Sequence, residues 1–244
     1  MSKYYYDLHV HSCLSPCADN DNTPNNIAGM GVINGLNIMA LTDHNSCKNC
    51  PAFFTAAKRQ GIIPIAGMEL TTAEDIHMIC LFPTLEAALA FDEEVGRRRI
   101  LVENRPDIFG DQLMLNGEDE PIGSEPYLLS NATTISVEES VPLTEYYGGV
   151  CYPAHIDREA NGIIAVLGAL PPSPAFSCVE LHDGEKELSL KDQIPPGCRV
   201  VVGSDAHFLW DIRDKDRYLE LDDTPYSGQL VRNRLIEWIR GGGE

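Results

Sequence analysis

The stretch Tyr4-Tyr5-Tyr6-Asp7-Leu8-His9-Val10-His11 lies near the start of the chain. Its aromatic-rich first part is typical of a β-strand, and two histidines follow at the end of that strand. Side chains two positions apart on an extended chain point to the same face, so His9 and His11 can bind one ion together. Histidine pairs also serve packing or hydrogen bonding, so the pair alone favours neither role.

The composition is that of a globular chain of 244 residues, 43% hydrophobic and 23% charged, and it predicts a single domain over residues 1–244. The longest apolar stretches, Gly61 to Leu70 and Gly162 to Leu170, are too short to cross a bilayer. The first residues also lack the pattern of a secretory signal. We therefore expect a soluble, cytoplasmic protein without a membrane partner.

Charge and cysteine content narrow the possible partners. A formal net charge of -19, from 37 acidic and 18 basic side chains, argues against a broad nucleic-acid-binding surface, because such surfaces carry basic patches. Eight cysteines suit either disulfides or metal ligation. In a reducing compartment, free thiols or metal ligands are favoured.

Acidic residues and histidines recur where predicted strands end or begin. Strands predicted at 36–41 and 62–66 lead to Thr42-Asp43-His44 and to Glu69. Only seven residues separate Glu69 from the next apolar run, which begins at His77. A parallel crossover needs about a dozen residues, so these two strands should form a hairpin with Glu69 and His77 at the same end.

The second half of the chain has the same arrangement of strands and ligand-type residues. Strands predicted at 150–154, 178–181 and 199–203 lead to His155, to His182 and to Ser204-Asp205-Ala206-His207. Predicted helices cover 24–33, 52–60, 84–99, a buried segment at 162–170, and 228–240.

Residues 84–148 should be an elaboration between barrel strands that covers the site. It should contain a hairpin turn at Asn116-Gly117 and a helix that starts with a capping box at Ser136. At the other end of the chain, residues 241–243 should fray.

About seven strands, mostly separated by helices, favour an α/β barrel over a sandwich. In such barrels the functional side chains gather at the C-terminal mouth of the strands. With one hairpin allowed, this rule places nine ligand-type residues together: His9, His11, Asp43, His44, Glu69, His77, His155, Asp205 and His207.

Nine candidate ligands are too many for one ion. Zinc and similar ions take four to six ligands, and a glutamate can bridge two ions, so the set predicts two or three divalent metal ions. Closely spaced metals deprotonate a shared water and neutralise phosphoryl oxygens. The predicted chemistry is therefore hydrolysis of phosphate esters by in-line attack of a metal-activated hydroxide.

The chain resembles the PHP (polymerase and histidinol phosphatase) superfamily in motifs that occur in order along almost its whole length: His9-x-His11, Thr42-Asp43-His44, Glu69, His77, His155 and Gly203-Ser204-Asp205-Ala206-His207. The resemblance implies a distorted seven-stranded β/α barrel, similar to a TIM barrel, with a trinuclear centre of zinc, manganese or iron at its mouth. It implies that one ion is held by His9, His11, Glu69 and Asp205. Glu69 would bridge to a second ion bound by His77 and His155, and a third would be held by His44, His207 and a residue of the first loop.

That first loop departs from the family pattern. The family usually has an acidic residue or a histidine there, in a Ser-Asp-Gly-like setting followed by Thr-Pro, but here Pro16-Cys17-Ala18 intrudes. Counting back from Thr23-Pro24 selects Asp19 as the remaining ligand, with Asp21 as the alternative.

Other polar residues are assigned around this set. Asp43 is placed in the catalytic group as a carboxylate that orients a ligand histidine. Arg158, three residues beyond His155, is the candidate cation for phosphate, with a surface salt bridge as the alternative. We expect His182 to be a satisfied surface histidine or a substrate contact, and Glu180 to be structural.

Two cysteine pairs, Cys13-x3-Cys17 and Cys47-x2-Cys50, lie just beyond ligand motifs on the loops after the first and second strands. Successive barrel strands are neighbours, so the four thiols can meet. They would then hold a structural zinc or an iron-sulfur cluster, or form disulfides; the alternative is four unlinked cysteines.

Three functions compete for this constellation. The favoured one is a phosphomonoesterase for a small metabolite, such as histidinol phosphate or a nucleotide, because the acidic charge favours a small substrate. The second is an exonuclease or phosphodiesterase for short oligonucleotides, guided by a few residues at the mouth. The third is an inactive structural PHP module of the kind attached to DNA polymerases.

Overall fold

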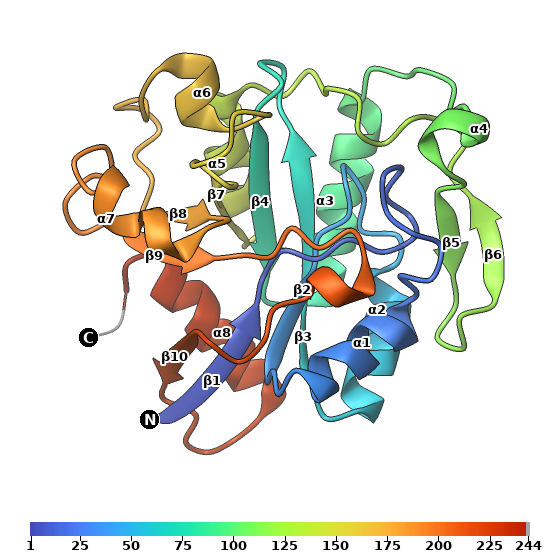
Figure 1. Ribbon diagram of the computed structural model, residues 1–244, viewed down its shortest axis with the longest axis horizontal. Coiled ribbons are helices and arrows are strands. Elements are labelled where there is room, and N and C mark those ends of the chain that lie inside the picture. The colour runs from blue at the N-terminus through green and yellow to red at the C-terminus, as the bar shows by residue number, and fades with distance from the viewer. Residues whose placement is uncertain (243–244) are drawn as a thin grey trace.

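A curled six-stranded sheet forms the centre of the computed structural model, which describes residues 1–242 (Figure 1). β1 to β3 run parallel, β4 is antiparallel to both β3 and β7, and β10 is antiparallel to β1. The sheet has the order β10 (Tyr218–Leu221), β1 (Ser2–Asp7), β2 (Ile38–Leu41), β3 (Ile63–Thr71), β4 (His77–Phe82) and β7 (Val150–Pro153). The β3–β4 hairpin that the short connection predicted is confirmed.

Two further strands continue the sheet toward a barrel. β8 (Cys178–Leu181) and β9 (Arg199–Val202) form a parallel pair. Beyond the end of β7, the Ile156 N–H donates to the Glu180 carbonyl at 2.9 Å, and a parallel bridge joins Val10 to Ala206 beyond the ends of β1 and β9. The predicted α/β barrel is therefore confirmed, as a distorted barrel that closes beside β1 only at its mouth.

Four longer helices cover the outside of this sheet: α1 (Pro24–Ile33), α2 (Cys50–Arg59), α3 (Leu85–Arg98) and α5 (Val137–Tyr146). A fifth, α8 (Gly228–Ile239), packs on its inner side. The predicted capping box of α5 is present, with Ser136 and Glu139 bonded reciprocally. Shorter helical turns lie in the connections: α4 (Pro106–Phe109), α6 (Ile163–Leu167), η1 (Gly184–Lys186), α7 (Glu187–Leu190) and η2 (Leu209–Asp211).

The apolar core has two parts, one on each side of the curled sheet. Side chains of α1, α2, α3 and α5 pack on the outer side of β2, β3 and β4. The inner part joins Tyr4, Tyr6 and Tyr152 of the strands to Leu235 and Ile239 of α8. The buried polar side chains therefore lie at the other end of the barrel, at the carboxyl ends of β1, β2 and β3.

The region between α3 and α5 contains a small hairpin, as the Asn116-Gly117 turn predicted. β5 (Leu113–Leu115) pairs antiparallel with β6 (Pro121–Ser124). The hairpin reaches the first loop of the chain, where the Leu113 N–H donates to the Cys13 carbonyl at 2.9 Å.

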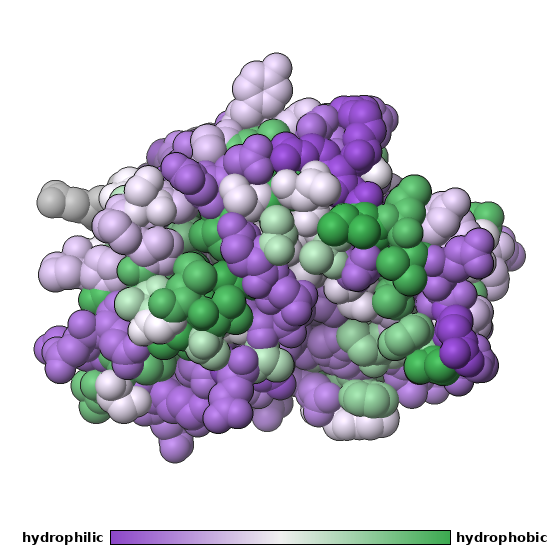
Figure 2. All heavy atoms as spheres, turned by 90° about the horizontal axis from the view of Figure 1, so that it is seen from above, coloured by the Kyte–Doolittle hydropathy of each residue, from purple (hydrophilic) through white to green (hydrophobic). Residues whose placement is uncertain are grey.

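The structure departs from the predictions at one helix and two strands. The segment 162–170 forms only the five-residue α6, because Gly168 takes a φ of 82° and ends the helix. Val166 and Leu167 are each 46% exposed, and Figure 2 shows apolar residues on the surface where α6 lies, so this helix is not buried. β3 extends to Thr71, which places Glu69 inside the strand, and β10 was not predicted.

The described residues contain no helix that is long and apolar enough to span a membrane. Residues 241–243 were expected to fray. Of these, Gly243 lies outside the described residues.

Candidate metal centre

The carboxylate of Glu69 is fully buried and is surrounded by histidine rings from four other segments of the chain. Its two oxygens lie 2.8 to 3.3 Å from ring nitrogens of five histidines, which are His9, His11, His44, His77 and His155. Asp205 also contacts His9 and His11. Its Oδ1 lies 3.3 Å from His9 Nε2 and 3.2 Å from His11 Nε2.

The strand order explains why these side chains converge. His9 and His11 follow β1, His44 follows β2, and all three strands β1 to β3 are parallel, so their carboxyl ends lie at one edge. The hairpin turn brings His77, the first residue of β4, opposite Thr71, two residues beyond Glu69.

The last two segments approach the centre with unusual backbone. His155 and Asp205 adopt φ angles of 25° and 52°, in the left-handed region that residues other than glycine seldom occupy. Such conformations cost about 1–3 kcal/mol each and concentrate at functional sites. The surrounding structure therefore holds these two ligand-type side chains in place at some expense in stability.

Three overlapping groups of donor atoms could each hold an ion, within the part of the chain that the structure describes. Within each group, one ligand atom per residue lies within 4.8 Å of all the others. The groups are His9, His11, Glu69 and Asp205; His44, Glu69 and His77; and His11, His44 and His207.

The donor set fits divalent metal ions. Glu69 Oε2, His44 Nδ1 and Asp205 Oδ1 are buried and have no hydrogen-bond partner, although they point at other donors. His9 Nε2 and His11 Nε2 lie 3.1 Å apart, about the separation of two nitrogens on one tetrahedral ion. Imidazole and carboxylate donors suit zinc, iron and manganese.

The charges of the site support the same conclusion. Burial disfavours a charged imidazole at His9, but the carboxylates of Glu180, Glu69 and Asp205 outweigh it and raise the pKa of His9 well above its usual value. The pKa of His11 is likewise raised to about 9, against burial, by the adjacent carboxylates of Asp205 and Glu69. The buried carboxylates thus require positive charge around them, which bound metal ions supply in place of protons.

His207 differs from the other rings of the site. Burial, followed by the positive charges of His11 and His44, lowers the pKa of His207 to about 3. Its Nδ1–H donates to the Asp205 carbonyl at 2.8 Å, so Nε2 keeps a free lone pair. His207 is therefore a neutral ring prepared to act as a ligand.

Glu180, which the sequence did not assign to the site, orients one of its rings. His9 Nδ1 donates to Glu180 Oε1 at 2.7 Å, and the His155 backbone N–H donates to the same oxygen at 3.2 Å. Glu180 approaches over Gly203, where a Cβ atom would lie 2.4 Å from Glu180 Oε2. Such carboxylates fix the orientation of a metal-binding histidine and make it more basic.

Asp43 lies one contact further from the centre. Its carboxylate accepts hydrogen bonds from Ser12 and from Ser15 Oγ, and Ser15 Oγ in turn lies 2.9 Å from His11 Nδ1. Asp43 therefore contacts His11 through Ser15, and its assignment to the catalytic group stays a prediction.

The first-loop candidates point in different directions. Asp19 Oδ1 accepts the Asp21 N–H at 2.8 Å, and neither Asp19 nor Cys17 belongs to any of the three donor groups. Cys17 Sγ lies 3.5 Å from His44 Nε2. Cys13 Sγ faces the Leu113 carbonyl, whereas Cys47 and Cys50 both face the Gly67 carbonyl, so the four loop thiols do not share one site.

A cavity of about 380 Å³ opens onto this centre, and Arg158 lies at its rim. The Arg158 guanidinium is ion-paired with Asp205, and the side chain is 41% exposed. A second cavity of about 440 Å³ adjoins it and is lined by Arg158, His182, Ser204, Asp205, His207, Phe208 and Asp211. Both predicted polar residues, Arg158 and His182, therefore lie beside the metal centre.

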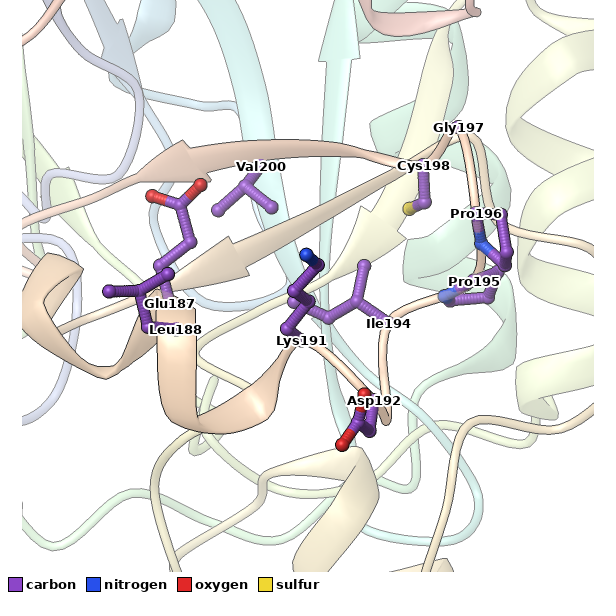
Figure 3. Close-up of a pocket in the computed structure, with 10 residues that line it drawn as sticks. All are labelled: Glu187, Leu188, Lys191, Asp192, Ile194, Pro195, Pro196, Gly197, Cys198 and Val200. Atoms are coloured by element: carbon purple, nitrogen blue, oxygen red, sulfur yellow. The ribbon is translucent and has the colours of Figure 1, made fainter.

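A larger cavity, of about 610 Å³, lies elsewhere, between α7 and β9 (Figure 3). Its lining is largely apolar and includes Ile194, Pro195, Pro196 and Val200. It contains none of the histidines, so it is separate from the metal centre.

The fold and the donor set define the class of protein: a distorted α/β barrel whose mouth carries a cluster of histidine and carboxylate donors that fits divalent metal ions. Residues 7–148, more than half of the chain, match the PHP domain model, and the chain belongs to the PHP family.

Curated relatives match over short stretches. The chain is 31% identical over 102 residues to the 5'-3' exoribonuclease of Haemophilus influenzae, which covers 38% of this chain and 36% of that protein. It is 34% identical over 77 residues to the error-prone DNA polymerase of Symbiobacterium thermophilum, covering 32% of this chain and 7% of the polymerase. The chain thus spans well under two thirds of the length of both relatives.

Solved structures match over nearly the whole chain. The lesion-specific endonuclease PfuEndoQ from Pyrococcus furiosus superposes with a TM-score of 0.64 at 19% identity, over 99% of this chain and 57% of that one. A protein assigned as a metal-dependent phosphoesterase from Bifidobacterium adolescentis gives a TM-score of 0.51 at 18% identity, over 98% and 96%. At such identities the likeness establishes the fold.

The position of Glu180 predicts an effect on metal affinity. Glu180→Gln keeps the shape of the side chain but removes the charge that orients His9, so we expect zinc affinity to fall roughly 10- to 100-fold. Competition titration of the apo-protein against a chromophoric chelator measures it. Glu187→Gln, on the exposed α7, is the matched control and should bind as the wild type does; equal affinity in both variants would refute the orienting role.

Proposed function

We propose that this protein hydrolyses small phosphate monoesters at the centre around Glu69. The proposal rests on the charge of the cavity over the metal centre. Among the described residues that line this cavity, Arg158 is the one arginine or lysine. A terminal phosphate can be bound by metal ions and one guanidinium, whereas a nucleic-acid backbone is usually followed by several basic side chains. The net charge of -19 supports the same preference.

Some residues of the site would hold the ions, and others would bind the substrate. Histidine, glutamate and aspartate side chains of the three donor groups would hold two or three divalent ions, with Glu69 shared between groups. Such ions, when bound, lower the pKa of water and neutralise phosphoryl oxygens. Arg158, held at the rim by Asp205, is placed to donate hydrogen bonds to the phosphate.

His182 is the residue placed to meet the alcohol part of the substrate. It lines the adjoining cavity, and its Nδ1 is buried without a hydrogen-bond partner. Burial, followed by the charge of Arg158, lowers the pKa of His182, so the ring is neutral near pH 7. A neutral imidazole can donate one hydrogen bond and accept another, which suits a polar leaving group.

The central test is metal content together with turnover of an aryl phosphate. We expect about three ions per chain in the wild type. His9→Ala should bind fewer and lose at least about a thousandfold in monoester hydrolysis, because each ion supplies several kcal/mol to the transition state. His182→Asn, outside the three donor groups, should keep its metal content.

The other outcomes of this test are distinct. A wild-type protein that hydrolyses a bis-aryl phosphate diester faster than the monoester would support the nuclease instead. A metal-poor protein that is inert toward both esters would contradict the hydrolase and favour a structural module.

Arg158 predicts a separate effect on substrate binding. Arg158→Ala removes a charge-assisted hydrogen bond worth about 1.5–3 kcal/mol, so kcat/KM for the aryl phosphate should fall roughly 10- to 150-fold. Metal content should remain as in the wild type. Arg105→Ala removes an exposed arginine that pairs with Asp107 and serves as the control. An unchanged kcat/KM in Arg158→Ala would mean that the arginine serves only its ion pair.

A second candidate is an exonuclease, or a phosphatase of nucleotides, and one surface feature favours it. Phe208 and Trp210 stack with ring centroids 4.9 Å apart and an interplanar angle of 14°. Phe208 lines the cavity beside Arg158, and Trp210 is 74% exposed. Exposed aromatic rings near a phosphate site are the usual platforms for nucleobases. The exoribonuclease and endonuclease relatives add support for nucleic-acid substrates.

Trp210 tests this candidate. Base stacking contributes about 1–3 kcal/mol, so Trp210→Ala should raise KM for a nucleoside monophosphate or a dinucleotide roughly 5- to 150-fold. KM for phenyl phosphate should change by less than twofold. Tyr146→Ala, another exposed aromatic residue on α5, is the control. Equal effects of Trp210→Ala on both kinds of substrate would exclude a base platform.

A further inference from the structure

We infer that the thiolate of Cys17 is the first-loop ligand of the third metal position, together with His44 and His207, in place of an aspartate. The inference rests on the metal centre of the proposed function and specifies the composition of one of its positions. A set of one thiolate and two imidazoles would give this position a softer donor than the imidazoles and carboxylates around Glu69.

The position of Cys17 relative to His44 is that of two ligands on one ion. Cys17 Sγ lies 3.5 Å from His44 Nε2. Zinc binds sulfur at about 2.3 Å and nitrogen at about 2.0 Å, so two such donors on a tetrahedral ion lie about 3.5 Å apart. The side chain of Cys17 also lines the cavity over the metal centre, beside His44 and His207.

Both histidines present a nitrogen to this position. His44 is nearly fully buried and has Nδ1 3.0 Å from Glu69 Oε2, so its other nitrogen, Nε2, faces the thiol. His207 uses Nδ1 to donate to the Asp205 carbonyl, which leaves Nε2 free. These two rings, with His11, already form a group of converging donor atoms.

A backbone hydrogen bond ties the loop that carries Cys17 to His207. The Asp19 N–H donates to the His207 carbonyl at 3.0 Å, two residues after Cys17. The carboxylate of Asp19 is turned into its own loop, where Oδ1 accepts the Asp21 N–H at 2.8 Å. Asp19 therefore contributes to the position by fixing the loop, while the thiol faces the cavity.

The other three loop cysteines are unsuited to this role. Cys13 is buried, and its Sγ faces the Leu113 carbonyl. Burial raises the pKa of Cys47 well above its usual value, and both Cys47 and Cys50 lie toward the Gly67 carbonyl. A thiol must lose its proton to bind a metal, so an exposed cysteine in contact with the His44 imidazole is the better ligand.

Cobalt substitution tests the inference on the full-length protein without using activity. Co²⁺ bound to a thiolate gives a sulfur-to-metal charge-transfer band in the near ultraviolet, which imidazole and carboxylate ligands do not give. We expect this band on titration of the apo-protein with cobalt chloride, and we expect Cys17→Ser to abolish it and to bind one ion fewer per chain. Cys198→Ser, in a half-buried cysteine far from the histidines, should keep the band, and so should Asp19→Asn.

A second variant separates ligation from a structural role. Cys17→Asp should restore the full cobalt stoichiometry without the charge-transfer band, because a carboxylate can replace the thiolate as a ligand. Cobalt binding by the wild type without the band would overturn the inference, leaving Cys17 as a hydrogen-bond partner of His44 and the rest of the centre intact. Failure to bind any cobalt would instead refute the metal centre of the proposed function.

Discussion

The structure depends on one buried carboxylate and the histidine rings that surround it. Glu69 is removed from water, and an isolated ionised carboxylate in that environment would cost several kcal/mol or more. Five histidine nitrogens lie within 3.3 Å of the Glu69 oxygens and offset this cost. These histidines belong to β1, β2, β4 and β7 or to the residues next to them. The barrel can place these strand ends around one point only because β3, which carries Glu69, lies in the middle of the sheet.

The convergence of these histidine and carboxylate side chains was predictable because each member is marked locally. An apolar run followed by a histidine or an acidic residue identifies a strand end, and the barrel rule then brings strand ends together. The short 69–77 connection added the hairpin that keeps His77 at the same edge. Composition, strand spacing and loop length were sufficient here because each of them constrains the backbone directly.

The partners of those ligands were not predictable in the same way. Glu180 and His9 are 171 positions apart, and nothing near Glu180 distinguishes it from a structural residue of a strand. Its role follows only from the close approach across Gly203. Similarly, α6 is short because Gly168 adopts a left-handed conformation that ends the helix. The apolar side chains of Val166 and Leu167 on α6 stay partly exposed. The periodicity of the sequence reveals neither feature.

The first loop shows how the elaboration between α3 and α5 serves the centre. The hairpin of residues 113–124 bonds to the loop at the Cys13 carbonyl, and Asn20 donates to Asp111 at 2.8 Å. Together with the Asp19 N–H bond to the His207 carbonyl, these contacts fix the loop at both sides of Cys17. A loop of this length would otherwise lose conformational entropy on binding an ion, and the free energy of binding would fall by that cost. The elaboration would therefore pre-organise the proposed metal position from behind the loop, while the cavity that Cys17 lines opens in front of it.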